Sequence, residues 1–141
     1  MTQPVTPDLY VEVQTFYARQ MRALDSGKLA DFAQSFTEDG VMRHLSRDDH
    51  VQGREAILAM LHAGLPAYEG FIPRHWFDKM LIEPIGEDVV RTDYYAMVTM
   101  TDVKGTVVLQ PTCVVEDELA RVDGALLLRS RVIHRDDLLL R

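Results

Sequence analysis

The first part of the chain follows a helical pattern of hydrophobic positions. From Leu9 to Leu24, apolar side chains recur every three or four residues, which predicts an amphipathic helix. Asp8 precedes this run as a candidate N-cap, and the Asp-Ser-Gly sequence at 25–27 predicts its end. Residues 1–7 contain two prolines and predict a flexible lead-in.

A second, shorter helix is predicted directly after the first. Leu29, Phe32 and Phe36 would share one face of it. The Thr-Glu-Asp-Gly sequence at 37–40 predicts a break, and residues 41–45 are long enough only for a short strand.

In the second half of the chain the pattern changes from helical to alternating. A third helix opens at Gly53 and ends by Gly70. Alternating positions rich in Val, Leu and Tyr then predict four strands joined by hairpin turns, over residues 74–85, 88–101, 106–121 and 125–134. Pro111 predicts an edge position or a bulge in the third of these strands. Helices followed by antiparallel strands predict one α+β domain over residues 1–141.

Composition and charge exclude several classes of protein. The 141 residues are 47% hydrophobic and 26% charged, which is ordinary for one globular domain. The net charge of -7, without a cluster of Lys and Arg, argues against nucleic-acid binding. No apolar run approaches the ~20 residues that a membrane helix needs. The polar amino terminus carries no secretory signal, so we expect a cytoplasmic protein.

The sequence contains no pattern that predicts a cofactor or a metal ion. Cys113 is the only cysteine, which excludes an internal disulfide and a cysteine-based zinc site. Asp48, Asp49 and His50 form a polar cluster, but no second histidine stands at helical spacing. Glycine-rich phosphate loops and serine nucleophile motifs are absent from the sequence. We therefore expect chemistry without a cofactor.

Four segments together resemble the SnoaL-like branch of the nuclear transport factor two-like superfamily. They are FYARQMRALDSGKLADFAQSFTEDGV (16–41), GREAI (53–57), RHWFDKMLIEPIGEDVV (74–90) and EDELARVDGALLLRSR (116–131). The resemblance implies a cone-shaped α+β barrel, in which a curved antiparallel or mixed sheet wraps over three N-terminal helices. The superfamily includes polyketide cyclases, scytalone-type dehydratases, ketosteroid isomerases, epoxide hydrolases and non-catalytic dioxygenase small subunits. The fold alone therefore does not indicate the function, and the residues of the pocket must be considered.

Two histidines are the candidate catalytic proton carriers, because imidazole titrates near neutral pH. By the resemblance, His44 falls where related isomerases place their general base, and His75 has the Arg-His-aromatic context of scytalone-type dehydratases. Strict alternation puts His75, Phe77 and Leu81 on one face of the strand. The structural alternatives are a surface or capping role for His44 and a half-buried, hydrogen-bonded His75.

The first helix carries a candidate hydrogen-bond donor for a substrate carbonyl. Tyr17 and Gln20 lie about one turn apart, facing the expected cavity together with Met21. The resemblance implies a tyrosine donor from this helix. Gln20 holds the position of that tyrosine, however, and Tyr17 is one turn earlier.

The third predicted strand offers a thiol and a carboxylate. Leu109, Cys113, Val115, Asp117 and Leu119 alternate on one side. By the resemblance, Cys113 or Asp117 would lie near the carboxylate that isomerases and cyclases place here, and the two registers stay open. The structural alternatives are a buried hydrophobic role for Cys113 and an exposed position in an acidic run for Asp117.

The remaining strands suggest pocket walls and a dimer interface. Tyr94 and Tyr95 are adjacent, so one faces the cavity and the other a partner; Tyr95 and Thr99 are assigned, with Phe77, to substrate binding. Arg129 and Arg131 are expected on the outer sheet face, where they could pair across a homodimer. His134, near the end of the last strand, is interpreted as structural.

The resemblance, together with these candidate residues, implies a cofactor-independent enzyme of aromatic polyketide antibiotic biosynthesis. It would cyclise or dehydrate a polycyclic ketone, as a lyase or isomerase, with His75 or His44 moving the proton and Tyr17 holding the carbonyl oxygen. The alternative is a non-catalytic binding or chaperone-like protein, or an interaction subunit like the dioxygenase small subunit.

Overall fold

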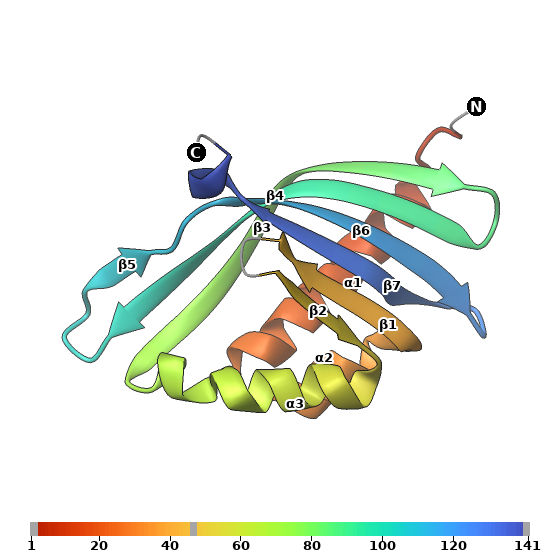
Figure 1. The fold of residues 1–141 in the computed structure, drawn as a ribbon. Coiled ribbons are helices and arrows are strands. Elements are labelled where there is room, and N and C mark those ends of the chain that lie inside the picture. The colour runs from red at the N-terminus through yellow and green to blue at the C-terminus, as the bar shows by residue number, and fades with distance from the viewer. Residues whose placement is uncertain (1–2, 46–47, 140–141) are drawn as a thin grey trace.

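A curved seven-stranded sheet wraps around three helices in the computed structural model, which describes residues 3–45 and 48–139 (Figure 1). The helices are α1 (Pro7–Asp25), α2 (Leu29–Gln34) and α3 (Arg54–Gly64), with short 3-10 turns at Leu65–Tyr68 and Asp136–Leu138. The strands are β1 (Phe36–His44), β2 (Asp49–Gln52), β3 (Phe71–Ile85), β4 (Val89–Asp102), β5 (Val107–Leu109), β6 (Cys113–Val122) and β7 (Ala125–Arg135). The predicted α+β cone is confirmed.

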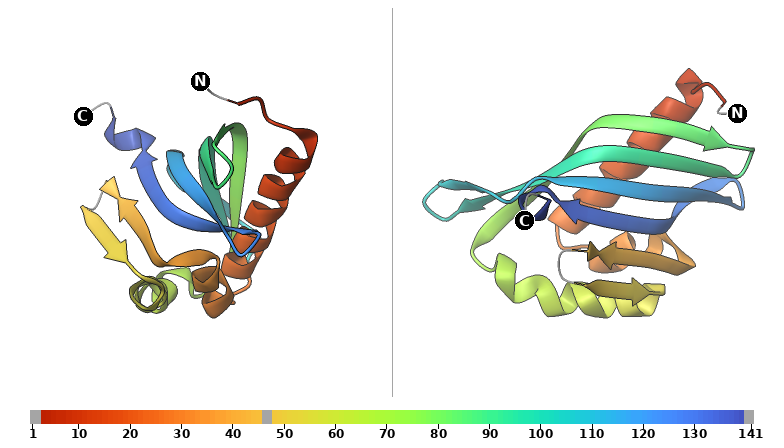
Figure 2. Two further views of the ribbon diagram at one scale, coloured as in Figure 1. Left: turned by 90° about the vertical axis from the view of Figure 1, so that its right-hand side faces the viewer. Right: turned by 45° about the horizontal axis from the view of Figure 1, so that its top comes forward.

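The sheet is mixed, with the order β2-β1-β7-β6-β4-β3, and β5 pairs with β4 beside this path. Neighbouring strands are antiparallel except β1 and β7, which run parallel. The helices lie on the concave side of the sheet, and α1 crosses it near β3 (Figure 2). We call this concave side the inner face and the opposite side the outer face. No helix among the described residues is long and apolar enough to cross a membrane.

The first helix begins two residues earlier than the sequence pattern indicates. Thr6, not Asp8, is its N-cap, because the Thr6 Oγ1 accepts the backbone N–H of Leu9 at 3.1 Å. Pro7 occupies the first helical position, where its missing N–H costs nothing. Asp8 contributes its negative charge to the first turn instead. The predicted end is confirmed, with Ser26 as the C-cap.

Strand β1 is longer than predicted and takes in the expected break at 37–40. Phe36 therefore belongs to β1 and not to the face of α2. A register shift between Phe36 and Val41 bends the strand at this point. Gly40 is needed here, because a Cβ atom at Gly40 would lie 3.0 Å from the Phe36 Cβ. The polar segment that follows forms the short strand β2, which the sequence pattern does not predict.

The third predicted strand is two strands, β5 and β6, with Pro111 in the gap between them. This agrees with the irregularity that Pro111 predicts, since proline cannot donate to the sheet. The other three long strands are confirmed within a few residues at each end.

Two β-bulges change which side chains face the helices. In β3, Lys79 and Met80 together oppose Tyr94, and Lys79 adopts a left-handed φ of 55°. His75 and Phe77 stay on the inner face, but Leu81 is turned to the outer face and is 71% exposed. The prediction that Leu81 shares their face is therefore wrong.

The second bulge lies in β7. Leu128 pairs with Leu119 while Ser130 pairs with Glu118, so Arg129 is an extra residue. The alternation changes phase there, and Leu128 and Arg131 both face inward. The expectation that Arg131 lies on the outer face is wrong, whereas Arg129 is exposed and pairs with Glu118.

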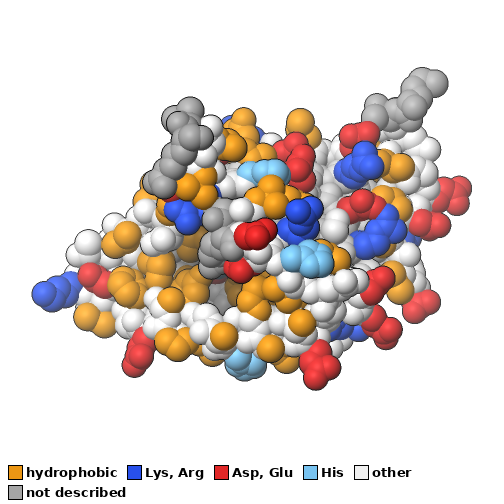
Figure 3. Space-filling view, viewed as in Figure 1, with side chains coloured by type: hydrophobic (Ala, Val, Ile, Leu, Met, Phe, Trp, Pro, Cys, Tyr) orange, Lys and Arg blue, Asp and Glu red, His pale blue; other side chains and the backbone are white. Residues whose placement is uncertain are grey.

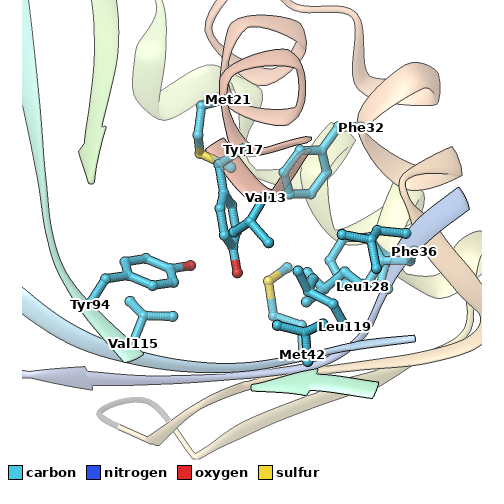
Figure 4. Close-up of a cluster of buried hydrophobic side chains, with 13 residues drawn as sticks. Val13, Tyr17, Met21, Phe32, Phe36, Met42, Tyr94, Val115, Leu119 and Leu128 are labelled. Atoms are coloured by element: carbon cyan, nitrogen blue, oxygen red, sulfur yellow. The ribbon is translucent and has the colours of Figure 1, made fainter. Parts of the chain in front are cut away.

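The inner face and the helices enclose one hydrophobic core. α1 contributes Val13, Tyr17 and Met21, and aromatic rings from α2 and β1 pack beside them (Figure 4). The rings of Phe32 and Phe36 meet edge to face, with centroids 5.5 Å apart. A row of buried polar groups lies against this core on the inner face.

Candidate active site

One row of cross-strand neighbours on the inner face is polar. Arg131 of β7, Asp117 of β6 and Thr92 of β4 are successive register partners, and all three are buried. Met42 of β1 extends the row on the far side of Arg131. Charged side chains are seldom fully buried without partners, so their hydrogen bonds decide what this row does.

Asp117 is the centre of a buried hydrogen-bond network. Its Oδ2 accepts the hydroxyl protons of Tyr17 and Tyr94, each at 2.7 Å. Figure 4 shows these two tyrosine hydroxyls turned toward each other. Arg131 donates from Nε to Oδ1 at 3.0 Å and from Nη2 to Oδ2 at 2.9 Å. Thr92 donates to the Tyr17 oxygen at 2.5 Å, because the Tyr17 proton is already directed at Asp117.

The network continues to the helices through Gln20. Its Oε1 accepts a second hydrogen bond from Arg131 Nη2 at 2.8 Å, and its Nε2 donates to Ser35 Oγ at 2.7 Å. Both ends of the amide are therefore engaged within the protein. Every buried side-chain nitrogen and oxygen among the described residues has a hydrogen-bond partner.

Asp117 is only 3% exposed, so its interpretation as an exposed member of the acidic run is wrong. Four donor contacts occupy its carboxylate, which leaves little capacity to accept a substrate proton. Burial and the Asp117 charge raise the pKa of Tyr17 well above its usual value. Burial also raises the pKa of Tyr94. Both tyrosines stay protonated and hold the carboxylate in place.

Arg131 keeps its charge although it is fully enclosed. Burial lowers its pKa, but the Asp117 carboxylate and the nearby oxygens of Tyr94 and Tyr17 together more than offset this, so the pKa is raised above its usual value. The guanidinium also lies over the ring of Phe77, 5.6 Å from its centroid. Phe77 in turn packs on Tyr94, with ring centroids 4.4 Å apart.

Away from this row, the inner face becomes apolar and less covered. Ala96, Val98, Cys113 and Ile133 face inward but are only half-buried. Half-buried apolar side chains of α3 lie on the same side of the molecule, and hydrophobic side chains gather over α3 in Figure 3. We call this less covered, apolar part of the inner face the open end of the cone.

Both candidate histidines face this open end. His75 is the register partner of Val98, and His44 is the register partner of Ile133. Partners directly opposite each other in a sheet share a face, so both imidazoles lie on the inner side. His44 is half-buried, and the His75 side chain is 17% exposed.

His75 is held by the last residue of α1. Its Nδ1 lies 2.6 Å from Asp25 Oδ1, and its backbone N–H donates to Asp25 Oδ2 at 3.1 Å. Within residues 3–45 and 48–139, no group hydrogen-bonds its Nε2. The imidazole is therefore fixed on one side and available on the other.

A wide cavity of 1190 Å³ lies between α1, α2, the start of β3 and the β6–β7 turn, and it reaches the Asp25–His75 pair. It is open to solvent, and charged side chains such as Arg19, Arg22 and Lys28 line it. Ring-shaped apolar ligands bury best against apolar walls, which the open end offers and this charged cavity does not. His75 lies where the two meet. The described residues contain no cluster of side chains that could hold a metal ion.

Several residues assigned to the site from the sequence lie elsewhere. Tyr95 is 60% exposed on the outer face, so Tyr94 and not Tyr95 is the inward tyrosine. Thr99 is also on the outer face, where it accepts a hydrogen bond from Trp76 Nε1 at 3.0 Å. Met21 is buried in the core.

Cys113 faces inward at the open end, on the same side of β6 as Asp117, as the alternation predicts for both. Burial raises the pKa of its thiol, which disfavours the reactive thiolate. His134 contacts Glu116 at 3.0 Å on the outer face, in line with a structural role.

Sequence reasoning missed some of the partners that complete the network. Thr92 and Ser35 carry no motif, and nothing in the local sequence distinguishes them from other strand or loop residues. Tyr94 is one of the two adjacent tyrosines of which the alternation predicts one to face inward. For Arg131 the available signal is its two-residue spacing from Arg129, which the bulge makes misleading.

Comparison with known proteins identifies one matching family and several similar structures. The family model of the SnoaL-like domain matches residues 8–132. The structure of Aln2 from a Streptomyces species is 45% identical with a TM-score of 0.92, covering 99% of this chain and 98% of that one. ActVI-ORFA from Streptomyces coelicolor is 34% identical with a TM-score of 0.86, covering 93% and 99%.

A third similar structure contains a ligand. The protein from Catenulispora acidiphila in complex with S-DNPA is 39% identical with a TM-score of 0.85, covering 96% of this chain and 98% of that one. A search of curated proteins found no significant match.

Proposed function

This chain belongs to the SnoaL-like domain family, and from that starting point we propose that it is a cofactor-independent acid–base enzyme. Its substrate is a polycyclic ketone of aromatic polyketide biosynthesis, in an antibiotic pathway of the cytoplasm, and its reaction is ring closure or dehydration. The observation that carries this proposal is an imidazole, His75, held by a carboxylate beside an apolar, incompletely covered inner face.

The relatives support a small-molecule ligand. One of them was solved in complex with S-DNPA, and this chain matches it over nearly its whole length. The apolar open end of the cone suits a ligand of fused rings, which the half-buried side chains of Val98, Cys113 and Ile133 would contact.

In the proposed reaction, Nε2 of His75 removes a proton from the carbon beside a substrate carbonyl. The C–H bond breaks, its electron pair forms an enolate, and an N–H bond forms at Nε2. For dehydration, the enolate expels a hydroxyl group, which takes the proton back from Nε2 and leaves as water. For ring closure, the enolate carbon attacks a second carbonyl, and the new alkoxide takes that proton.

The two other candidate catalytic residues, His44 and Tyr17, have different roles in this proposal. His44 is a second imidazole on the same inner face and is the reserve candidate for the proton carrier. Tyr17 directs its hydroxyl proton at Asp117. We therefore assign Tyr17 to the support of the site, where it holds the carboxylate, and not to the substrate oxygen.

The proposal is tested by replacing His75 with Ala. We expect turnover of an aromatic polyketide ketone to fall at least ~100-fold, the usual scale for the loss of an acid–base group. His134→Ala is the matched control, because this histidine lies on the outer face and should leave turnover unchanged. His44→Ala, measured in parallel, assigns the role if His75→Ala has no effect.

Ligand binding separates an enzyme from a binding protein. The binding of S-DNPA to the wild type, to His75→Ala and to His44→Ala is measured by isothermal titration calorimetry. If the wild type binds S-DNPA but shows no turnover of an aromatic polyketide ketone above the uncatalysed rate, the non-catalytic alternative is supported and the proposed function is contradicted.

A further inference from the structure

Ala96 is the smallest side chain on the inner face of β4. The residues of β4 that face inward are Val90, Thr92, Tyr94, Ala96, Val98 and Met100. Alanine is depleted in strands, and protein interiors are normally packed without large gaps. A larger side chain would be expected at position 96 if the protein itself filled the space in front of it.

That space is not filled. Ala96 is only half-buried although its side chain is a single methyl group, whereas Tyr94 and Met100 on the same face of β4 are 0% and 8% exposed. Val98 and Cys113, which lie beside Ala96 on the inner face, are half-buried as well. A methyl group among larger neighbours stays accessible only where no side chain covers it, so a gap lies above Ala96.

The side chains around this gap are aromatic, aliphatic or sulfur-containing. Phe77 of β3 and Cys113 of β6 are the direct cross-strand partners of Ala96. The Phe77 ring packs on Tyr94, with ring centroids 4.4 Å apart. Flat aromatic rings make favourable contacts with such side chains. The gap therefore suits one ring of an aromatic ligand better than a charged group.

The gap also lies close to the proposed proton carrier. Phe77 pairs with Ala96, and His75, two residues earlier on the same face, pairs with Val98. His75 and Ala96 are thus diagonal neighbours, which in a sheet are about 7–8 Å apart. A ring above Ala96 would place the atoms of the next fused ring beside the imidazole.

We propose that Ala96 is a specificity-determining residue, whose small side chain leaves room above β4 for one aromatic ring of the ligand. That the ligand is a fused-ring ketone rests on the proposed function, whereas the place of the ring follows from the size and exposure of Ala96. A larger residue at position 96 would occupy that place and exclude the ligand.

The test fills the gap with Ala96→Val and Ala96→Leu. S-DNPA, the ligand of a similar structure, is the probe, and isothermal titration calorimetry measures its binding. Ala96→Leu should raise the Kd at least ~10-fold, with a smaller increase for Ala96→Val, because ring and side chain would compete for one space. The thermal unfolding temperature of both variants without ligand should be unchanged or higher, since the added carbons fill a gap.

Ala120→Leu is the matched control. Ala120 is also a half-buried alanine in the same sheet, but it lies on the outer face, as the register partner of Val89. This variant should bind S-DNPA as tightly as the wild type. Loss of binding in Ala120→Leu as well would contradict a site above Ala96.

Cys113 reports on the ligand without any change to Ala96, because it is the only thiol of the chain. Iodoacetamide alkylation, followed by mass spectrometry at alkaline pH, should slow about tenfold when S-DNPA is present at about ten times its Kd, since bound protein is shielded. The comparison is Ala120→Cys combined with Cys113→Ser, whose outer-face thiol should react equally fast with and without S-DNPA.

Equal affinity of the wild type and Ala96→Leu for S-DNPA would overturn the inference, and so would a wild type that does not bind S-DNPA. A lower unfolding temperature of Ala96→Val would overturn it too, because the space would then already be filled. If Ala96→Leu fails to fold, Ala96→Val and the alkylation of wild-type Cys113 decide, and alkylation that bound S-DNPA does not slow contradicts the inference.

Failure of the proposed function is a separate outcome. If His75→Ala keeps full turnover while S-DNPA protects Cys113 and Ala96→Leu loses binding, the acid–base role of His75 is wrong and the ring site above Ala96 is supported. If His75→Ala is inactive but Ala96→Leu still binds S-DNPA as the wild type does, the catalytic role is supported and the ring site is wrong.

Discussion

Arg131 is a fully buried charge that one carboxylate balances. Asp117, Gln20 and the ring of Phe77 surround its guanidinium, and the hydroxyls of Tyr17 and Tyr94 complete the shell of Asp117. Such a pair contributes little compared with a well-packed apolar core, but breaking it leaves a charge without compensation. Replacing one partner is therefore destabilising, because the partner that remains keeps a buried charge without compensation.

Arg131→Met should lower the free energy of unfolding by about 3–5 kcal/mol, because the Asp117 carboxylate stays buried without its counter-charge. Urea denaturation followed by circular dichroism measures this. Arg129→Met is the control on the same strand, since Arg129 pairs with Glu118 at the surface and should cost at most ~1 kcal/mol. Equal effects of the two substitutions would contradict the buried network.

At the scale of elements, a bidentate ion pair connects α1 to the end of β6. Arg121 donates from Nη2 to Glu12 Oε1 at 2.8 Å and from Nη1 to Oε2 at 2.9 Å. The hydrogen bonds from Arg121 hold the pKa of Glu12 below its ordinary value of 4.5. A lowered folded-state pKa means that the contribution to stability is present above pH 4.5 and is lost as the pH falls through the folded value.

Glu12→Gln should therefore destabilise the protein only on the alkaline side of this range. Both side chains are partly exposed, so we expect about 0.5 kcal/mol at pH 7. Chemical denaturation at pH 7 and at about pH 3.5 should show the difference from wild type shrinking at the lower pH. Glu87→Gln, an exposed turn residue without an ion pair among the described residues, should show no such trend.

The elements also show what the sequence pattern can and cannot predict. Long periodic segments such as α1 and β4 are predicted closely, because periodicity reports which face is buried. The bulges at Lys79 and Arg129 each insert one residue, and the faces of Leu81 and Arg131 then reverse. Local sequence gives no separate signal for an extra residue, because the partner strand creates it.

The same distinction applies to the candidate site, where periodicity predicts which side chains face inward but not which distant residues they contact. His75 and Tyr17 can be predicted to face inward from periodicity alone. The Asp25–His75 contact joins residues 50 positions apart, and the Tyr17–Asp117 contact joins residues 100 positions apart. One sequence does not reveal such long-range partners, whereas the folded chain places them within hydrogen-bond distance.

At the scale of the whole molecule, the outer sheet face is unusually apolar. Trp76 and its cross-strand partner Met97 are exposed there, and so are Tyr95 on β4 and Leu109 on β5. Charges of both signs border them, including Glu116 beside Asp93 and Glu118 beside Arg91. A face with mixed charges around an apolar centre can pair with a copy of itself across a two-fold axis.

We therefore expect a homodimer through the outer face. Size-exclusion chromatography with light scattering should give twice the chain mass at micromolar concentration, and Tyr95→Glu should convert the protein to a monomer by burying an unpaired charge. Val11→Glu is the control, since Val11 is exposed on α1, away from the sheet. A monomeric wild type would contradict the expected homodimer through the outer face.

The parallel contact between β1 and β7 also has a consequence for synthesis of the chain. β1 is among the first strands made, yet its neighbours are β2 and the last strand, β7. Before residues 125–135 are synthesised, β1 has β2 as its only strand neighbour, and a two-stranded hairpin is at best marginally stable in water without further packing. Closure of the cone must therefore await synthesis of β7, and such distant pairing is expected to make folding slow compared with helical proteins of similar size.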